Sequence, residues 1–256
     1  MNITVIKVGG AVVEQPASLS TLLDQFVRLE GPKVLVHGGG RSATALAAQL
    51  GIESQMVGGR RITDAHMLRI VTMVYGGLVN KNIVAQLQAR GVNALGLTGA
   101  DLNLIRAHRR PVTPEGIDFG FVGDVDSADG PRLHQLLGSG IVPVIAPLTH
   151  DGQGNLLNTN ADTMAMTVAA ALSAAQAPVS LTFCFELPGV LRNPTDPSSL
   201  IGHLTETDFR SLVADGTISG GMIPKLENAF RALQQGVSSV RITNTTQLTG
   251  GTVISH

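Results

Sequence analysis

Short apolar runs rich in Val, Ile and Leu recur along the chain and alternate with stretches of helical periodicity. We expect strands at residues 3–8, 33–37, 93–97, 141–146, 179–185 and 239–242. We expect helices at residues 19–29, 42–50, 65–89, 161–174, 206–214 and 223–235. Strands that are apolar throughout, and that alternate with helices, are typical of parallel sheets buried on both faces. The sequence therefore predicts an α/β fold with a mostly parallel central sheet.

Two regions, 51–62 and 102–125, interrupt this alternation with Gly, Pro and short apolar pairs. We expect them to form hairpins or lids at the edge of the sheet. The helical stretch 65–89 contains Gly76 and Gly77, and a glycine inside a helix costs about 1 kcal/mol relative to alanine. The two glycines indicate either a kink or break in the helix, or the close approach of another backbone, for instance across a dimer interface.

The composition limits the class of protein. The chain has 256 residues, of which 43% are hydrophobic and 14% are charged, and its formal net charge is −1. Such a chain can bury a large core, and disorder is not expected. Because no run of basic residues is present, we expect no nucleic-acid partner. The single cysteine, Cys184, has no partner for an internal disulfide, so we expect it to be buried in a protein of the reducing cytoplasm.

Residues 163–185 carry no charged side chain over a length that could span a bilayer. The segment consists mostly of Ala, Ser and Thr and contains Gln176 and Pro178. We interpret it as a buried helix, a turn and a buried strand, and we expect no membrane span. The turn at 176–178 is also the best candidate for a division into two lobes.

Three glycine-rich turns follow or precede these elements: "KVGGAV" at 7–12, "VHGGGRS" at 36–42 and "SGGMIPK" at 219–225. Glycine lets backbone N–H groups converge on a ligand, and such groups favour an anion at a helix N-terminus. Ligands of open α/β sheets bind beyond the carboxyl ends of the strands. The three turns, two of them with a nearby lysine, therefore predict a phosphate site. The P-loop, dinucleotide and protein-kinase motifs do not match.

Five segments, in this order, resemble motifs of the amino acid kinase family: "IKVGG", "VLVHGGGRSA", "GRRIT", "LLNTNADTMA" and "SGGMIPKLENA". The resemblance covers nearly the whole chain, and the last two segments are the most specific. It implies a three-layer α/β/α sandwich with an eight-stranded, mostly parallel sheet. It also implies an N-terminal lobe, about 1–176, that binds an acylated amino acid, and a C-terminal lobe, about 177–256, that binds ATP.

Within the family, the chain resembles the branch that transfers the γ-phosphoryl group of ATP to the side-chain carboxylate of N-acetyl-L-glutamate. A free carboxyl group has a pKa near ~4.3, so it is ionised at neutral pH and needs no general base. The difficulty is that an anion approaches a polyanion, so catalysis consists of positioning and charge neutralisation. One charge pair at ~4 Å contributes roughly 4 kcal/mol at an effective dielectric constant of ~20. Two fixed lysines therefore suit the reaction.

The resemblance assigns roles to individual residues. Lys7 and Lys225 would stabilise the transition state on either side of the transferring phosphoryl group, and Asp162 would lie between them and orient both ammonium groups. The predicted substrate-binding residues are Gly39, Gly40, Arg61 and Asn158, with Arg61 gripping the α-carboxylate. The predicted cofactor-binding residues are Gly9, Gly10, Glu186, Gly189, Thr217 and Ser219. Mg²⁺ would be carried on the ATP phosphates, and the scattered histidines predict no metal site in the protein.

Simpler interpretations of the same residues remain open. Lys7 could be a lysine at a strand end that reaches water, and Asp162 an acid that complements a helix dipole. Arg61 could pair with Asp64 on the surface. His37 follows an apolar run, and we expect it to be structural rather than catalytic.

The sequence departs from the family pattern on the ATP side, where it reads "CFELPGV". There Glu186 takes the place of an aspartate, and Phe183, Phe185 and Pro188 are unusual. The segment "LTGADLN" at 97–103 also differs. These departures concern the acyl group and the nucleotide contacts more than the phosphoryl transfer.

The first expected strand begins at the start of the sequence, without the N-terminal helix of the arginine-inhibited, hexameric members of the family. We therefore expect a homodimer, insensitive to arginine and joined through the helix at 65–89. Alternative functions are the same reaction on another N-acylglutamate, such as N-succinylglutamate, and a kinase of aspartate or carbamate. A non-catalytic ligand sensor of the same fold, and an oxidoreductase suggested only by "HGGGRSA", complete the alternatives.

Overall fold

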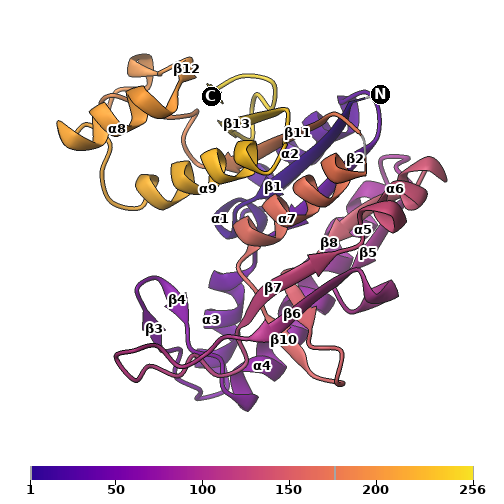
Figure 1. The fold of residues 1–256 in the computed structure, drawn as a ribbon. Helices are drawn as coiled ribbons and strands as arrows, with labels where there is room; N and C mark the ends of the chain where they lie inside the picture. The colour runs from indigo at the N-terminus through magenta and orange to yellow at the C-terminus, as the bar shows by residue number, and fades with distance from the viewer. Residues whose placement is uncertain (1, 176, 256) are drawn as a thin grey trace.

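A central eight-stranded sheet organises the computed structural model, which describes residues 2–175 and 177–255 (Figure 1). Its strands run in the order β12-β14-β13-β11-β1-β2-β8-β5. Their bounds are β1 Ile3–Val8, β2 Lys33–His37, β5 Ala94–Leu97, β8 Val142–Ile145, β11 Val179–Phe185, β12 His203–Leu204, β13 Ser239–Asn244 and β14 Thr252–Ile254. Every neighbouring pair is parallel except β13 and β14. The predicted mostly parallel sheet is confirmed.

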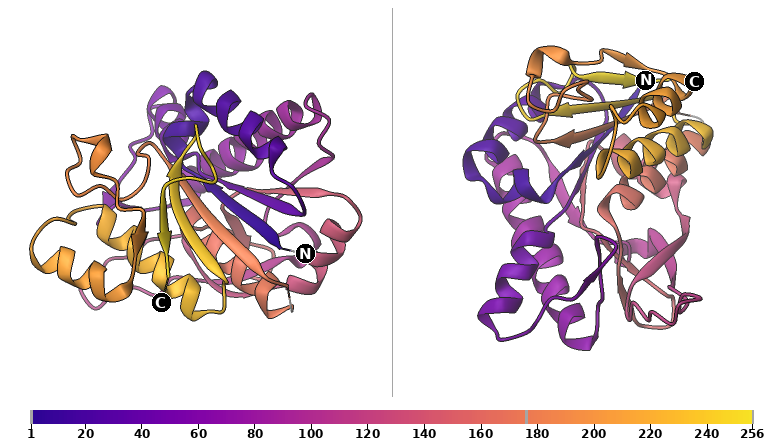
Figure 2. Two further views of the ribbon diagram at one scale, coloured as in Figure 1. Left: turned by 90° about the horizontal axis from the view of Figure 1, so that it is seen from above. Right: turned by 90° about the vertical axis from the view of Figure 1, so that its left-hand side faces the viewer.

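Helices cover both faces of this sheet (Figure 2). One face packs against α1 Gly10–Glu14, α2 Pro16–Arg28, α3 Gly40–Gln49, α4 Ala65–Val71, η1 Thr72–Val79 and α5 Asn80–Gln88. The other face packs against α6 Gly130–Gly138, α7 Ala161–Ala174, α8 Glu206–Ala214 and α9 Met222–Gln234. Successive residues of β1 alternate between the two apolar layers: Val5 faces α7 and α9, whereas Ile6 and Val8 face α2 and α3. The three-layer α/β/α arrangement is confirmed.

A second, smaller sheet lies below the first and has the order β10-β9-β6-β7. Its strands are β6 Ile105–Arg109, β7 Gly123–Ala128, β9 Leu148–His150 and β10 Leu156–Asn158, and a separate hairpin joins β3 Met56–Val57 to β4 Arg60–Arg61. The hairpin predicted in 51–62 is therefore present. The region 102–125 contributes β6 and the start of β7, which pair antiparallel, so the hairpin predicted there is present, but it belongs to this second sheet rather than to the edge of the central sheet.

The helical stretch 65–89 is continuous through α4, η1 and α5, and no break occurs at its glycines. The middle segment, Thr72–Val79, is a π-helix that contains both glycines. A Cβ atom at Gly76 would lie in ordinary contact with Leu148, 3.5 Å from its Cδ1, whereas Gly77 faces open space. The glycine pair thus lies in a segment of wider winding, and the helix is not broken there.

Parallel pairing aligns the ends of distant segments. Val8, the last residue of β1, lies opposite His37 in β2 and opposite Cys184 in β11. The turns that follow these strands therefore lie side by side at the carboxyl edge of the sheet, where α/β proteins bind ligands. A Cβ atom added to Gly38 would be only 3.0 Å from the backbone nitrogen of Gly10. This close approach of two backbones favours glycine at position 38.

Cys184 is fully buried, as predicted, and burial raises the pKa of its thiol to about 12. Among the described residues, no helix has the length and apolarity needed to cross a bilayer. The boundary predicted for the two lobes falls at residue 176, outside the described residues, so the division into lobes stays a prediction.

Candidate active site

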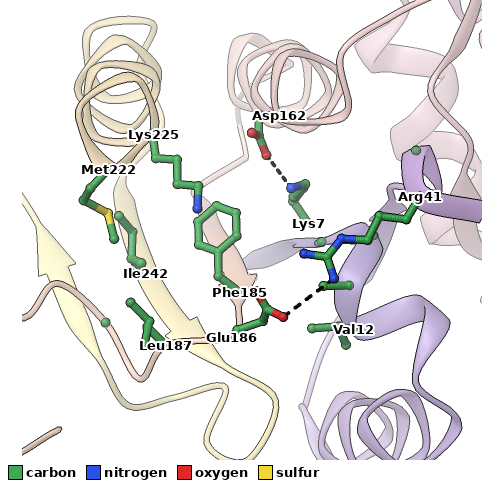
Figure 3. A pocket seen from close by; sticks show the side chains of 15 residues that line it. Lys7, Val12, Arg41, Asp162, Phe185, Glu186, Leu187, Met222, Lys225 and Ile242 are labelled. Atoms are coloured by element: carbon green, nitrogen blue, oxygen red, sulfur yellow. Dashed lines mark ion pairs between the residues drawn. The ribbon is translucent and has the colours of Figure 1, made fainter. Parts of the chain in front are cut away.

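A cavity of about 400 Å³ opens at the carboxyl edge of the central sheet (Figure 3). Its lining includes Lys7 from β1, Asp162 from α7, Phe185 from β11 and Lys225 from α9, and we call it the lysine cavity. These four residues come from segments far apart in the sequence. Gly9, Gly10, Glu186 and Gly189, which the sequence assigned to the cofactor, also line it.

Lys7 and Asp162 form a close ion pair in this cavity. Lys7 is only 6% exposed, and its Nζ lies 2.6 Å from Asp162 Oδ1, although the alignment is not that of a hydrogen bond. Lys7 is therefore not a strand-end lysine that reaches water. Asp162 lies in the first turn of α7, after the N-cap Asn160, whose side chain accepts hydrogen bonds from the Asp162 and Thr163 backbone. It consequently faces both the dipole of this helix and the Lys7 ammonium.

Phe185 is the aromatic ring between the two lysines. The Nζ atoms of Lys7 and Lys225 lie 4.8 and 4.0 Å from its ring centroid, within the range of cation–π contacts. The ring is also stacked with Phe183, at 6.1 Å between centroids. In the sequence, Phe185 stood out only as a departure from the family pattern. It is the second aromatic residue of β11, after Phe183, and no pattern within the strand indicated its contacts with the two lysines.

The charge of Lys225 is less well compensated than that of Lys7. Burial lowers the pKa of Lys225, and the neighbouring Lys7 ammonium lowers it further, while Asp162 and Glu186 oppose the shift. Within the described residues, Asp162 pairs with Lys7 and no ion pair forms with Lys225. Asp162 thus holds one of the two predicted ammonium groups rather than both. A partly buried cation without a close carboxylate suits an incoming anion.

A second cavity of about 250 Å³ adjoins the first and shares Gly40 with it. Its lining includes Arg60, Arg61 and Arg110, and we call it the arginine cavity. The predicted substrate-binding residues Gly39, Gly40, Arg61 and Asn158 all line it. The structure therefore brings the predicted catalytic residues and the predicted substrate-binding residues to two adjoining cavities.

Arg61 is held by several partners at the wall of the arginine cavity. Its Nη1 donates to Ser54 Oγ at 2.7 Å, and its Nη2 donates to Gly40 O at 2.9 Å and to Thr44 Oγ1 at 2.8 Å. It does not pair with Asp64, whose side chain instead accepts from the Met67 backbone and caps α4. Arg61 therefore ties the β4 hairpin to the glycine turn that separates the two cavities.

The pair Arg110 and Asp124 also lines the arginine cavity and was not predicted from the sequence. Nε and Nη2 of Arg110 donate to the Asp124 carboxylate, which lowers the pKa of Asp124. Arg110 Nη1 is shielded from solvent and has no hydrogen-bond partner among the described residues. Arg110 belongs to "HRRPV", where nothing distinguished it from Arg109 before the fold was known.

The remaining predicted residues lie at the margin. Glu186 lies 4.0 Å from Arg41, and both side chains are exposed, so this pair contributes little to stability. Thr217 and Ser219 precede α9 and are not part of the lining described for either cavity. Thr217 donates its backbone N–H to Asp215, and Ser219 O accepts from the Met222 N–H.

The sequence of the chain matches a known family. The model of the amino acid kinase family matches residues 2–244, and the chain therefore belongs to the amino acid kinase family. Among relatives, an acetylglutamate kinase of Bacteroides thetaiotaomicron is 64% identical over 242 residues, which cover 94% of this chain and 93% of that protein. An acetylglutamate kinase of Phocaeicola vulgatus is 59% identical over 99% of this chain and 98% of its own length.

Among solved structures, the protein smu.665 of Streptococcus mutans UA159 superposes with a TM-score of 0.81 at 27% identity. The match covers 99% of this chain and 98% of that one. The family resemblance inferred from the five sequence segments is confirmed.

Proposed function

We propose that this protein transfers the γ-phosphoryl group of ATP to the side-chain carboxylate of N-acetyl-L-glutamate, a step of arginine biosynthesis. The names of relatives at 59–64% identity over almost the whole chain support this substrate. The observation that carries the chemistry is the pair of lysines facing one ring in a cavity that adjoins a second, arginine-lined cavity.

In this proposal the ATP phosphates occupy the lysine cavity. Lys7 and Lys225 bind oxygens of the transferring group, and the charge that develops there is neutralised by ammonium groups already in position. Asp162 orients Lys7, whose Nζ lies 2.6 Å from Asp162 Oδ1. Among residues 2–175 and 177–255, no carboxylate forms an ion pair with Lys225, so its interaction with the nucleotide breaks no ion pair there.

The acylated amino acid occupies the arginine cavity in this proposal. Arg61 and Asn158 bind the α-carboxylate and its neighbouring polar atoms, while Gly39 and Gly40 donate N–H groups. Because Gly40 lines both cavities, the side-chain carboxylate reaches the phosphoryl group beside this turn. The nucleophile is already ionised near neutral pH, so no side chain has to remove a proton.

Mg²⁺ fits this site as an ion carried by the nucleotide. Mg²⁺ keeps several waters and is usually bound by one or two carboxylates plus substrate phosphates. Asp162 and Glu186 are the carboxylates in the described lining of the lysine cavity, and Asp162 is already paired with Lys7. When bound, the ion would screen the charge of the phosphates.

A second candidate substrate is an N-acylglutamate whose acyl group ends in a carboxylate, such as N-succinylglutamate. The arginine cavity is lined by three arginines against one aspartate, Asp124, and Arg110 Nη1 has no partner among the described residues. A substrate with an additional carboxylate would compensate this excess of positive charge.

We also propose a cytoplasmic homodimer joined through the helix that runs from α4 to α5. Met73 and Leu78 on η1 are 53% and 67% exposed, and Leu95 on the edge strand β5 is 37% exposed. Exposed apolar side chains gathered on neighbouring elements are typical of an interface. Light scattering of the purified protein would show twice the monomer mass, and a monomer at micromolar concentration would contradict the proposal.

The function is tested by trapping the acyl phosphate with hydroxylamine in the presence of ATP, Mg²⁺ and either N-acetylglutamate or N-succinylglutamate. Wild type should form the trapped product, and the more active substrate identifies the acyl group. Lys225→Ala should lose most of this activity. Equal rates for both proteins would contradict the mechanism, and no product from either substrate would contradict the substrate class.

A further inference from the structure

His37 occupies a position that the proposed mechanism has not yet used. It is the last residue of β2, is 0% exposed, and directly precedes the turn Gly38, Gly39 and Gly40. It lines neither cavity, yet all three glycines after it line the arginine cavity, and Gly40 also lines the lysine cavity. A buried imidazole at this point acts on the site only through the backbone that follows it.

The hydrogen bonds around His37 define its tautomer. The Asn80 amide nitrogen lies 3.1 Å from His37 Nε2 and donates its other hydrogen to Val144 O at 2.9 Å. Lys81 Nζ donates to Asn80 Oδ1 at 3.1 Å and to Gly96 O at 3.0 Å, which fixes the orientation of the amide. Since an amide nitrogen only donates, Nε2 accepts and the proton is on Nδ1.

The Nδ1–H group donates to the carbonyl oxygen of Gly38 at 2.8 Å. Burial lowers the pKa of His37 to about 4, and the Lys81 ammonium acts in the same direction, so the ring stays neutral at physiological pH. The ring is therefore a rigid, neutral donor aimed at one backbone carbonyl, with its acceptor nitrogen occupied by Asn80.

A held carbonyl also fixes the N–H group on the other side of the same peptide. The peptide between Gly38 and Gly39 is trans and planar, so its C=O and N–H bonds point in opposite directions. With Gly38 O bound to His37, the Gly39 N–H points away from the imidazole. Gly39 N has no hydrogen-bond partner among the described residues and lies 3.5 Å from where a Cβ of Gly10 would be.

We propose that His37 is a positioning residue which, by holding the Gly38 carbonyl, aims the Gly39 N–H at an oxygen of the reacting groups where the two cavities meet. The inference rests on the proposed function, because that function brings anionic oxygens to this turn. A preorganised N–H stabilises the charge that develops on such an oxygen without reorganising during the reaction. Asn80 belongs to the same hydrogen-bonded arrangement, since it selects the His37 tautomer that donates to Gly38 O.

Two substitutions of His37 separate this role from simple packing. In His37→Asn the side-chain amide nitrogen lies near the position of Nδ1 and can still donate to Gly38 O. In His37→Gln the amide reaches the position of Nε2 and can satisfy Asn80, but it loses the donor to Gly38. We expect kcat within about fivefold of wild type for His37→Asn and a loss on the order of 10²-fold for His37→Gln, with little change in either KM.

Thermal unfolding of both variants provides the comparison with stability. The proposal would be overturned if His37→Asn and His37→Gln lost kcat equally and in proportion to their loss of thermal stability. Full activity of His37→Gln would also overturn it. If either variant does not fold, Asn80→Ala in the intact enzyme tests the same hydrogen-bonded arrangement. An unchanged kcat in Asn80→Ala would overturn the proposal.

A measurement without substrate separates this inference from the proposed function. ¹⁵N spectra of the imidazole at pH 7 should show the tautomer protonated at Nδ1, and protonation at Nε2 would overturn the inference while leaving the kinase function standing. Conversely, a wild-type protein that phosphorylates no N-acylglutamate would overturn the proposed function, whichever tautomer is observed.

Discussion

In the lysine cavity two ammonium groups face one aromatic ring and one close carboxylate, whereas in the arginine cavity Arg61 and Arg110 are already hydrogen-bonded to the protein. Lys225 has a lowered pKa and no ion pair among the described residues, while Arg110 is clamped by both oxygens of Asp124. The first cavity therefore keeps charge free for a ligand that brings its own negative charge. In the second cavity the charged groups are hydrogen-bonded to one another or to the protein, and these bonds hold the wall of the cavity in a fixed shape.

The largest expected effect comes from the lysine cavity. Lys7→Met removes an ammonium from the site and leaves Asp162 without its partner at 2.6 Å. We expect kcat for acyl-phosphate formation to fall on the order of 10³-fold, as for other preorganised cations in phosphoryl transfer. Arg210→Met is the control, because Arg210 forms only an exposed pair with Glu206 on α8. A loss below tenfold in Lys7→Met would place the transferring group elsewhere.

The arginine cavity should respond in substrate affinity. Arg110→Gln removes a guanidinium from its wall and leaves Asp124 without its clamp. Hydrogen bonds to charged groups contribute about 1.5–3 kcal/mol, so the KM for the acylated amino acid should rise roughly 10- to 100-fold with little change in the KM for ATP.

Arg109→Gln is the matched control for Arg110→Gln. Arg109 also pairs with an aspartate, Asp118, but lies outside the described cavity lining. We expect its kinetic constants to stay near those of wild type. Similar increases of KM in both variants would show that the positive charge of the whole region, rather than the cavity wall, sets the affinity.

A smaller effect is expected from the ring that the two lysines share. Phe185→Leu keeps an apolar side chain at the end of β11 but removes both cation–π contacts, which together are worth about 1–2 kcal/mol at about 0.5–1 kcal/mol each. We expect the KM for ATP to rise between about fivefold and thirtyfold, while the KM for the acylated amino acid stays constant. Steady-state kinetics with each substrate varied in turn shows which KM changes, and therefore which of the two cavities Phe185 affects.

The smallest effect is a shift along the pH axis. The pKa of Lys225 is lowered from 10.5, first by burial and then by Lys7, so Lys225 loses its proton at a lower pH than in the unfolded chain. Between the folded and unfolded pKa values the unfolded chain binds more protons, so this group makes the folded state more stable as the pH rises. Over the same range the neutral amine binds phosphate less well, so the KM for ATP should increase.

Lys225→Arg keeps the charge at every accessible pH. It should move the alkaline increase of the KM for ATP to higher pH, and an unchanged profile in this variant would assign the titration to another group. The alkaline gain in stability should disappear as well, which chemical denaturation at several pH values would measure.

The sequence predicted the long strands well and the short ones poorly. β1, β2 and β11 are mostly apolar because both of their faces are buried, and this pattern is visible before folding. β9, β10 and β14 have three residues each, too few for any periodicity to identify them. The helix α6 was also missed, although Asp129 caps it and Pro131 lies at its start.

Residues of the site were predictable only where a motif within one short segment identified them. Lys7 stands out because a cation precedes two glycines, and the residues assigned from the family resemblance line the two cavities apart from Thr217 and Ser219. Phe185, Arg110 and the tautomer of His37 depend on contacts between segments that are far apart in the sequence. No pattern within one segment reports such contacts, and the roles assigned to all these residues stay predictions.

The sequence by itself determined which segments become buried strands and helices, and where glycine permits backbones to meet, because burial and backbone freedom are properties of local residue types. Only the tertiary structure decided which charges are compensated. Parallel strands bring Lys7 and Phe185 to one edge of the sheet, and α7 and α9 bring Asp162 and Lys225 to the same place. Of the two lysines, Lys7 forms an ion pair with a carboxylate, and Lys225 forms none within the described part of the chain. The strength of a charge depends on distance and on exclusion of water, and both are set by packing.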